Sequence, residues 1–100
     1  MIRMATHAVA IHGLADMTDE IQLGGLDAAL RDGVDAALRG AGFSSRVVTT
    51  GHLAARDPGN ICNRAASGGV QLEIGRALRD KMRADGAVCA ADANAIRHAL

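Results

Sequence analysis

Large side chains are scarce in this chain of 100 residues, whose one aromatic residue is Phe43. Tryptophan and tyrosine are absent, and proline and lysine occur once each. The core must therefore be built from small aliphatic groups, and a domain of this length buries only roughly 60–65% of its unfolded surface. Two cysteines are too few for a disulfide scaffold, and Cys62 and Cys89 lack C-x-x-C spacing. We expect both to be reduced thiols.

A net charge of either sign is also missing, because eleven basic and eleven acidic residues cancel. Nucleic-acid-binding proteins usually combine a basic stripe with stacking aromatic residues, and this sequence has neither. No apolar run approaches the length that spans a bilayer, and the first residues do not begin a secretory signal. These absences argue against nucleic-acid and membrane partners. They favour a globular cytoplasmic protein, and the excess of arginine over lysine is typical of GC-rich bacterial or phage genes.

Short apolar runs alternate with segments of helical periodicity, which predicts an α/β fold with a partly parallel sheet in one domain over residues 1–100. Strands are predicted over residues 6–12, 20–23, 46–49 and 70–74. The first of these should be a buried strand bounded by Gly13. Helices are predicted over residues 26–41, from residue 74 to a stop at Gly86, and from a cap at Asp92 onward. The intervening residues 51–69 form a long irregular segment, which is unusual in a small domain unless it is functional.

The helix over residues 26–41 is the most strongly patterned element. Its apolar residues recur at helical spacing, and two acid–base pairs four residues apart occupy the opposite face. The pairs are Asp27 with Arg31 and Asp35 with Arg39. We expect both pairs to lie on a solvated surface.

Within the irregular segment, residues 57–64 bring two amides and a guanidinium together between turn-forming residues. Asn60, Asn63 and Arg64 are the residue types that hold carboxylate groups through paired hydrogen bonds. Asparagine side chains also mimic backbone turns, so a purely local role in the loop is the alternative.

An imidazole and a carboxylate belong to two of the predicted strands. His12 ends the first apolar run, and imidazole is the commonest metal ligand in proteins. In the strand over residues 70–74, alternation places Glu73 and Gln71 on the face opposite to the apolar residues. A strand-borne glutamate is a common general base. The alternatives are a solvated histidine and a surface carboxylate. We expect His12 and Glu73 to meet on neighbouring strand ends.

Together these segments resemble the poly-gamma-glutamate hydrolase family, phage-related zinc peptidases with a carboxypeptidase-like α/β fold. The resemblance runs from about residue 8 to the final helix. It rests on His-Gly at 12–13, Gly-Gly-Leu-Asp at 24–27, Asn-Ile-Cys-Asn-Arg at 60–64, and Gly-Val-Gln-Leu-Glu at 69–73 with Arg76 to Arg79 after it. It implies a partial mixed sheet of about four strands flanked by helices.

The resemblance also implies a function, the zinc-dependent hydrolysis of a γ-linked glutamyl amide in an acidic peptide or polymer. His12 corresponds to the third zinc ligand, and Glu73 to the general base that takes a proton from zinc-activated water. Asn60, Asn63 and Arg64 would hold a substrate carboxylate or polarise the scissile carbonyl.

The chain departs from the family in one respect, because it lacks the upstream His-x-x-Glu motif that supplies the first two zinc ligands. It therefore resembles the C-terminal half of the family, and Asp16, Asp19 or Glu20 could add oxygen ligands. One hypothesis is a hydrolase, or the half of one that needs a second polypeptide. The other is a truncated, catalytically inactive remnant, or a module that binds acidic peptides. A phage replication role has no support in the composition. We expect the isolated chain to dimerise or aggregate through an unpaired strand edge or an apolar face.

Overall fold

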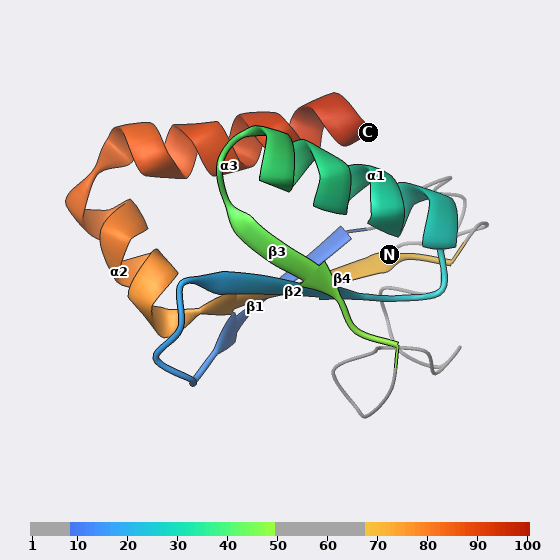
Figure 1. Cartoon of the computed structure of the whole chain (residues 1–100), viewed down its shortest axis with the longest axis horizontal. Coiled ribbons are helices and arrows are strands. Elements are labelled where there is room, and N and C mark those ends of the chain that lie inside the picture. The colour runs from blue at the N-terminus through green and yellow to red at the C-terminus, as the bar shows by residue number, and fades with distance from the viewer. Residues whose placement is uncertain (1–8, 50–67) are drawn as a thin grey trace.

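The computed structural model describes residues 9–49 and 68–100, which form a four-stranded mixed sheet flanked by helices (Figure 1). The strand order is β1-β4-β2-β3. β1 pairs with β4 and β2 pairs with β3 in parallel, whereas β2 and β4 are antiparallel. The elements are β1 (Val9–Leu14), β2 (Glu20–Gly24), α1 (Ala28–Gly40), β3 (Ser44–Val47), β4 (Val70–Gly75), α2 (Arg76–Ala84) and α3 (Gly86–Ala99). The predicted fold class is confirmed.

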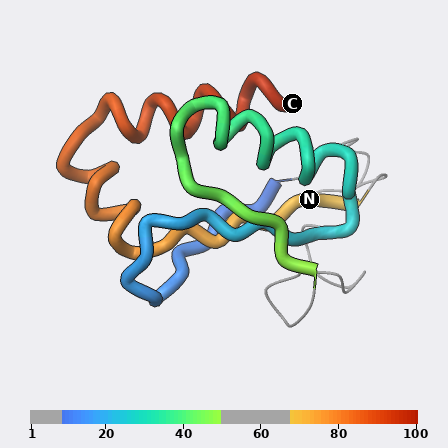
Figure 2. The backbone as a smooth tube through the Cα atoms, in the orientation of Figure 1, coloured from blue at the N-terminus to red at the C-terminus, as the bar shows by residue number. Residues whose placement is uncertain are grey.

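One face of the two inner strands, β4 and β2, carries the core. Residues alternate along each strand, so Leu72 and Ile74 of β4 lie opposite Leu23 and Ile21 of β2 on the same face. Buried residues of all three helices join these side chains in one hydrophobic cluster. Figure 2 shows α1 and α3 crossing the same side of the sheet. The helices therefore cover the apolar face of the sheet.

The helix predicted over residues 26–41 is confirmed as α1, but one of its two predicted ion pairs is wrong. Asp27 is the N-cap, and its Oδ1 accepts a hydrogen bond of 3.1 Å from the backbone N–H of Leu30. Its side chain is buried rather than solvated. Arg31 forms its ion pair with Asp32 instead, at 3.1 Å. A capping carboxylate satisfies a free N–H of the first turn, which a solvated pair would leave unbonded.

The second predicted pair is confirmed, since Arg39 lies 3.3 Å from Asp35. The side chain of Asp35 is also mostly buried. Its Oδ1 accepts a hydrogen bond of 2.6 Å from the hydroxyl of Ser45. This contact joins α1 to the edge strand β3, so the acidic residue fixes tertiary structure in addition to its helix pair.

The first strand differs from its prediction in length and in burial. β1 continues through Gly13 to Leu14, and residues 1–8 lie outside the described ranges. Within the part of the chain that the structure describes, its only strand neighbour is β4. Ile11 is consequently 58% exposed although it shares the face of Leu72. In the described sheet, β1 is therefore an edge strand and not the buried strand that its apolar composition predicted.

The C-terminal helices also begin and end differently from the prediction. α2 ends at Ala84, and Gly86 begins α3 rather than ending the preceding helix. The N-cap of α3 is Asp85, whose side chain accepts a hydrogen bond of 2.9 Å from the N–H of Ala87. Asp92 is therefore not a cap but a buried residue in the middle of α3.

The connection between β1 and β2 caps the N-terminus of α2. The N–H of Arg76 donates to the carbonyl of Asp16 at 3.0 Å, and the N–H of Ala77 donates to the carbonyl of Thr18 at 3.1 Å. Gly75 permits this close approach, because a Cβ atom there would lie 2.1 Å from the Thr18 carbonyl oxygen. Backbone carbonyls of the connection thus replace a capping side chain.

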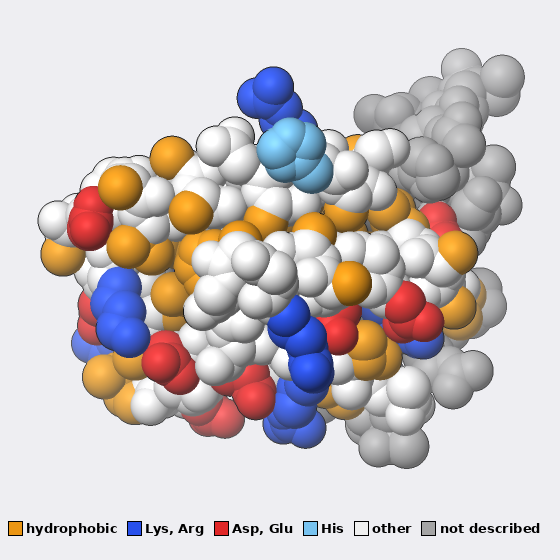
Figure 3. Space-filling model, turned by 45° about the horizontal axis from the view of Figure 1, so that its top comes forward, with side chains coloured by type: hydrophobic (Ala, Val, Ile, Leu, Met, Phe, Trp, Pro, Cys, Tyr) orange, Lys and Arg blue, Asp and Glu red, His pale blue; other side chains and the backbone are white. Residues whose placement is uncertain are grey.

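The surface seen in Figure 3 mixes acidic, basic and apolar side chains without an extended patch of one sign.

The described cysteine, Cys89, is free and exposed. Among the residues that the structure describes, no helix is long and apolar enough to cross a membrane.

We predict that Gly75→Ala strongly destabilises the protein. The added methyl group would overlap the Thr18 carbonyl, a backbone atom that cannot move without losing the cap of α2. We expect the free energy of unfolding to fall by about 2–4 kcal/mol, the range of severe core and backbone lesions. Urea unfolding followed by circular dichroism measures it.

Gly33→Ala is the matched control, because nothing lies within 4 Å of a Cβ at that exposed position in α1. It should stabilise the protein by about 0.5–1 kcal/mol through helix propensity alone. Equal effects of the two substitutions would contradict the close approach at Gly75.

Asp92 is a second feature of the core with an energetic consequence. It is 7% exposed on the inward face of α3, and its Oδ1 has no hydrogen-bond partner in the described ranges. Burial raises the pKa of this carboxyl above its ordinary value of 3.8. The folded protein therefore binds this proton more tightly than the unfolded chain does.

We predict that Asp92→Asn stabilises the protein at neutral pH, by about 1 kcal/mol or more, since it removes a poorly solvated charge. Because the folded-state pKa is the higher one, the contribution of Asp92 is most favourable below pH 3.8 and is lost as the pH rises through the raised value. The variant should lack this decline. Urea unfolding across that pH range checks it, with Asp80→Asn on exposed α2 as a control. Parallel pH profiles for wild type and Asp92→Asn would refute the assignment.

Candidate functional site

The pairing of β1 with β4 brings His12 and Glu73 together. The two residues are direct register partners in the parallel ladder. Opposite residues of neighbouring strands point to the same face, and the strands are about 4.8 Å apart. His12 is exposed at the edge of the sheet, whereas Glu73 is 8% exposed on an inner strand. The prediction that these residues meet on neighbouring strand ends is confirmed, and Glu73 is not a surface carboxylate.

The same register continues across the sheet. Glu73 pairs with Gln22 of β2, and Gln22 pairs with Arg46 of β3. We call His12, Glu73, Gln22 and Arg46 the polar row. It crosses all four described strands on the face opposite to Leu72, which packs in the core.

Glu20 holds the outer end of the polar row. Its Oε1 accepts a hydrogen bond of 2.7 Å from the Arg46 guanidinium and one of 3.2 Å from the Gln22 amide. The side chains of Glu20 and Arg46 are partly solvated, so their ion pair stabilises the fold little. The hydrogen bond from Gln22 to Glu20 orients the amide of Gln22, the register partner of Glu73.

Gln71 forms a hydrogen bond with the carboxylate of Glu73 on the inner strand β4. Its Nε2 donates a hydrogen bond of 3.0 Å to Glu73 Oε1, and both side chains are buried. The two residues are two apart on β4, so they share a face. Sequence reasoning placed Gln71 on this face but gave it no role. The spacing of two was the available signal, because neighbours on one face of a strand can bond to each other.

The other residues proposed for the site fall into two groups. Asn60, Asn63 and Arg64 fall outside the described ranges, so their predicted role in holding substrate stays a prediction. Of the possible oxygen ligands, Asp19 pairs with Lys81 at 3.4 Å and Glu20 pairs with Arg46.

The ligands needed for a metal ion are incomplete. In residues 9–49 and 68–100, no three His, Cys, Asp or Glu side chains lie close enough together to hold one. The possible ligands that do meet are His12 and Glu73, one imidazole and one carboxylate.

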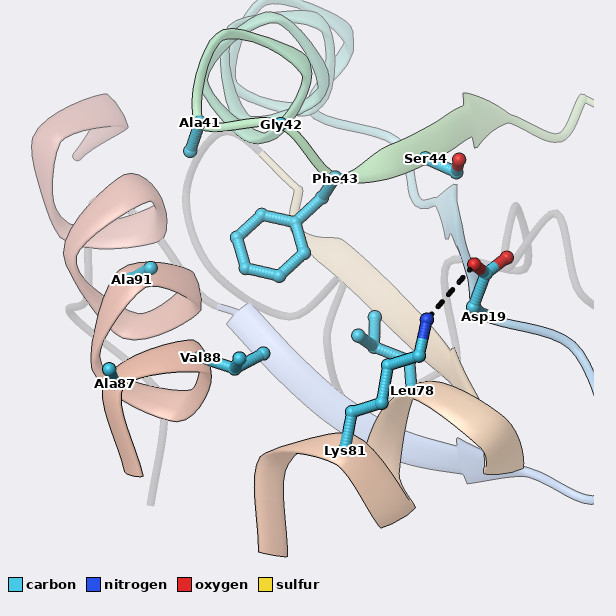
Figure 4. Close-up of a pocket in the computed structure, with 10 residues that line it drawn as sticks. All are labelled: Asp19, Ala41, Gly42, Phe43, Ser44, Leu78, Lys81, Ala87, Val88 and Ala91. Atoms are coloured by element: carbon cyan, nitrogen blue, oxygen red, sulfur yellow. Dashed lines mark hydrogen bonds and ion pairs between the residues drawn. The ribbon is translucent and has the colours of Figure 1, made fainter. Parts of the chain in front are cut away.

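A cavity of about 390 Å³ lies apart from the polar row (Figure 4). It opens between α2, α3 and the turn that follows α1, on the helical side of the sheet. The ring of Phe43 points into it between Val88 and Leu78, and the Asp19–Lys81 ion pair borders it. The cavity therefore belongs to the packing of the helices and not to the face that carries His12 and Glu73.

Comparisons with known proteins agree with this arrangement. The sequence profile of the poly-gamma-glutamate hydrolase family matches residues 1–95. A solved structure described as bacteriophage poly-gamma-glutamate hydrolase is similar, with a TM-score of 0.84 and 34% sequence identity. That match covers 94% of this chain and 51% of the other. No curated protein matches the sequence.

A second similar structure is described as YNDL-apo, zinc-free, with a TM-score of 0.68 and 26% sequence identity. The match covers 74% of this chain and 38% of that one. This chain thus spans about half the length of the bacteriophage structure and less of the second.

We predict that Gln71→Met destabilises the protein by about 1–3 kcal/mol, because a buried carboxylate loses a hydrogen-bond donor. The cost should be smaller in a Glu73→Gln background, where no charge is left without its donor. Chemical unfolding of the two single variants and the double variant gives the coupling energy. Strictly additive effects would show that the Gln71–Glu73 contact contributes nothing.

Proposed function

We propose that the chain is a zinc-dependent hydrolase of γ-linked glutamyl amides or one part of such an enzyme, because it belongs to the poly-gamma-glutamate hydrolase family. The observation that carries the proposal is the register of His12 opposite Glu73 on one face of the sheet. The substrate would be an acidic γ-linked peptide or polymer.

In this proposal Glu73 is the general base. Its carboxylate accepts a proton from the water that attacks the scissile amide and later returns it to the leaving amine. Gln71 holds Oε1 of Glu73 at 3.0 Å, which leaves the other oxygen to face the reacting water. His12, exposed at the edge of the sheet, is the candidate metal ligand.

The described residues do not complete a zinc centre. Catalytic zinc sites usually take three protein ligands, and His12 would supply one. We propose that the others come from outside the described ranges or from a second polypeptide that joins the chain. The partner could instead be a second copy of the chain.

Substrate binding is assigned to Asn60, Asn63 and Arg64. Amide and guanidinium groups match the carboxylates of a glutamyl polymer, because each can form paired hydrogen bonds with one carboxylate. The role rests on residue chemistry and on the family resemblance.

The alternative is a catalytically inactive remnant or a module that binds acidic peptides. It is favoured by the shortage of metal ligands in the described part of the chain. Such a protein would keep Glu73 and Gln71 as parts of a buried polar face without using them in chemistry.

We predict that zinc binding depends on His12. The chain is dialysed against micromolar zinc, and the bound metal is measured for wild type and His12→Ala. The affinity should fall about tenfold or more when a ligand is lost. His98→Ala, on an exposed part of α3, is the matched control.

Hydrolysis of poly-gamma-glutamate, followed by the release of new amines, is the second measurement. Glu73→Gln should reduce it by about 10²-fold or more, the contribution of a general base. A wild-type chain that binds no zinc and cleaves no polymer would exclude a hydrolase that works alone, and would leave one part of a larger enzyme and the inactive alternative.

A further inference from the structure

One arginine bonds to both of the strands that carry His12 and Glu73. Arg79, in the second turn of α2, donates from Nη2 to the carbonyl of Leu14 at 2.8 Å. Its Nε donates to the carbonyl of Ile74 at 3.2 Å. A single planar guanidinium thus bonds to the last residue of β1 and to the residue directly after Glu73.

The position of these carbonyls relates Arg79 to the candidate site. Ile74 is the register partner of Gly13, and Gly13 follows His12. The guanidinium therefore joins the two strands one step beyond the His12–Glu73 pair, on the helical side of the sheet. It acts through the backbone and touches neither side chain of the pair.

Gly13 makes room for this contact. A Cβ atom at position 13 would lie 2.9 Å from Cζ and Nη1 of Arg79, so a larger residue would push the guanidinium away. The glycine beside His12 is consequently matched to an arginine that lies 66 residues further along the chain.

Among the described residues, Arg79 bonds to backbone carbonyls and not to a carboxylate. In the described ranges no carboxylate lies within 4.0 Å of its guanidinium, and the side chain is half-buried. Hydrogen bonds from a charged donor contribute more than neutral ones. Two such bonds to neighbouring strand ends restrict how far the strands can separate.

β1 needs this restraint because it is an edge strand. In the described part of the chain, β4 is its one strand neighbour, and the pairing ends at Leu14 and Gly75. Ladder ends open readily, and His12 lies only two residues before this end. Without Arg79, the end of β1 would separate from β4 close to the site.

We propose that Arg79 is a positioning residue that fixes His12 relative to Glu73 by bonding the ends of β1 and β4. The geometric part of this inference stands by itself, and its catalytic meaning rests on the function proposed above. A role in general stability would instead weaken the whole fold evenly.

The experiment compares Arg79→Met with Arg76→Met, an exposed arginine of the same helix. Two NMR readouts are used: amide exchange along β1 and β4, and nuclear Overhauser contacts between residues 12 and 73. In Arg79→Met, exchange of the protected amides at the paired ends of β1 and β4, near Leu14 and Gly75, should become about tenfold faster, as expected when a local opening loses one charged hydrogen bond. The contacts between residues 12 and 73 should weaken, while exchange in α1 and α3 stays unchanged. Arg76→Met should match wild type.

Two further variants keep the test decisive if Arg79→Met does not fold. Arg79→Lys keeps the charge but loses the planar fork that spaces two donors, so its effect should be intermediate. Gly13→Ala keeps the arginine but displaces it, and it should speed exchange at the same strand ends. Unchanged exchange and contacts in these variants, or a uniform rise across the whole sheet and helices, would overturn the inference.

Zinc affinity of the same variants separates this inference from the proposed function. If Arg79 positions a metal ligand, affinity should fall in Arg79→Met and recover partly in Arg79→Lys. A wild-type chain that binds no zinc, with strand ends that still open in Arg79→Met, would refute zinc binding by this chain alone and retain Arg79 as the residue that fixes the pair. Normal zinc affinity in Arg79→Met, together with unchanged contacts between residues 12 and 73, would refute the positioning role and retain the zinc function.

Discussion

The parallel register between β1 and β4 is the constraint on which the rest of the structure depends. It sets His12 opposite Glu73, and the antiparallel pairing of β4 with β2 extends the row to Gln22. Because side chains alternate along a strand, a slip of one residue in β1 would turn His12 to the helical face. The core residues on that face and the polar row on the other therefore fix each other. The site is a by-product of correct core packing.

The pairing of β1 with β4 explains why the described part of the site lacks metal ligands near His12 but fixes Glu73 firmly. β1 lies at the edge of the described sheet, where His12 is exposed, and the described residues there supply too few ligands for a metal. The chain spans about half the length of the bacteriophage hydrolase structure that it resembles. Glu73 lies further in, where Gln71 bonds to it and Arg79 bonds to the following carbonyl. The inner half of the site is thus fixed by described residues of this chain, whereas His12 at its outer half is exposed.

Sequence reasoning predicted most of the secondary structure and the family. The periodicity of α1 and the alternation along β4 are repeated within a few residues, so they can be read without knowing the rest of the chain. The placement of His12 and Glu73 on neighbouring strands also came from the sequence, through the family resemblance. Where local patterns have two solutions the predictions failed: Asp27 caps its helix, and Asp92 is buried in the middle of α3.

By itself, the sequence determined which segments become strands and helices, and which face of β4 is polar, because these depend on side chains only a few positions apart. The tertiary structure alone decided that β1 is an edge strand, that Gln71 bonds to Glu73, and that Arg79 joins the ends of two strands. Contacts of this kind depend on the path of the backbone between distant residues. Arg79 and Leu14 are 65 positions apart, so no local sequence pattern could predict their contact.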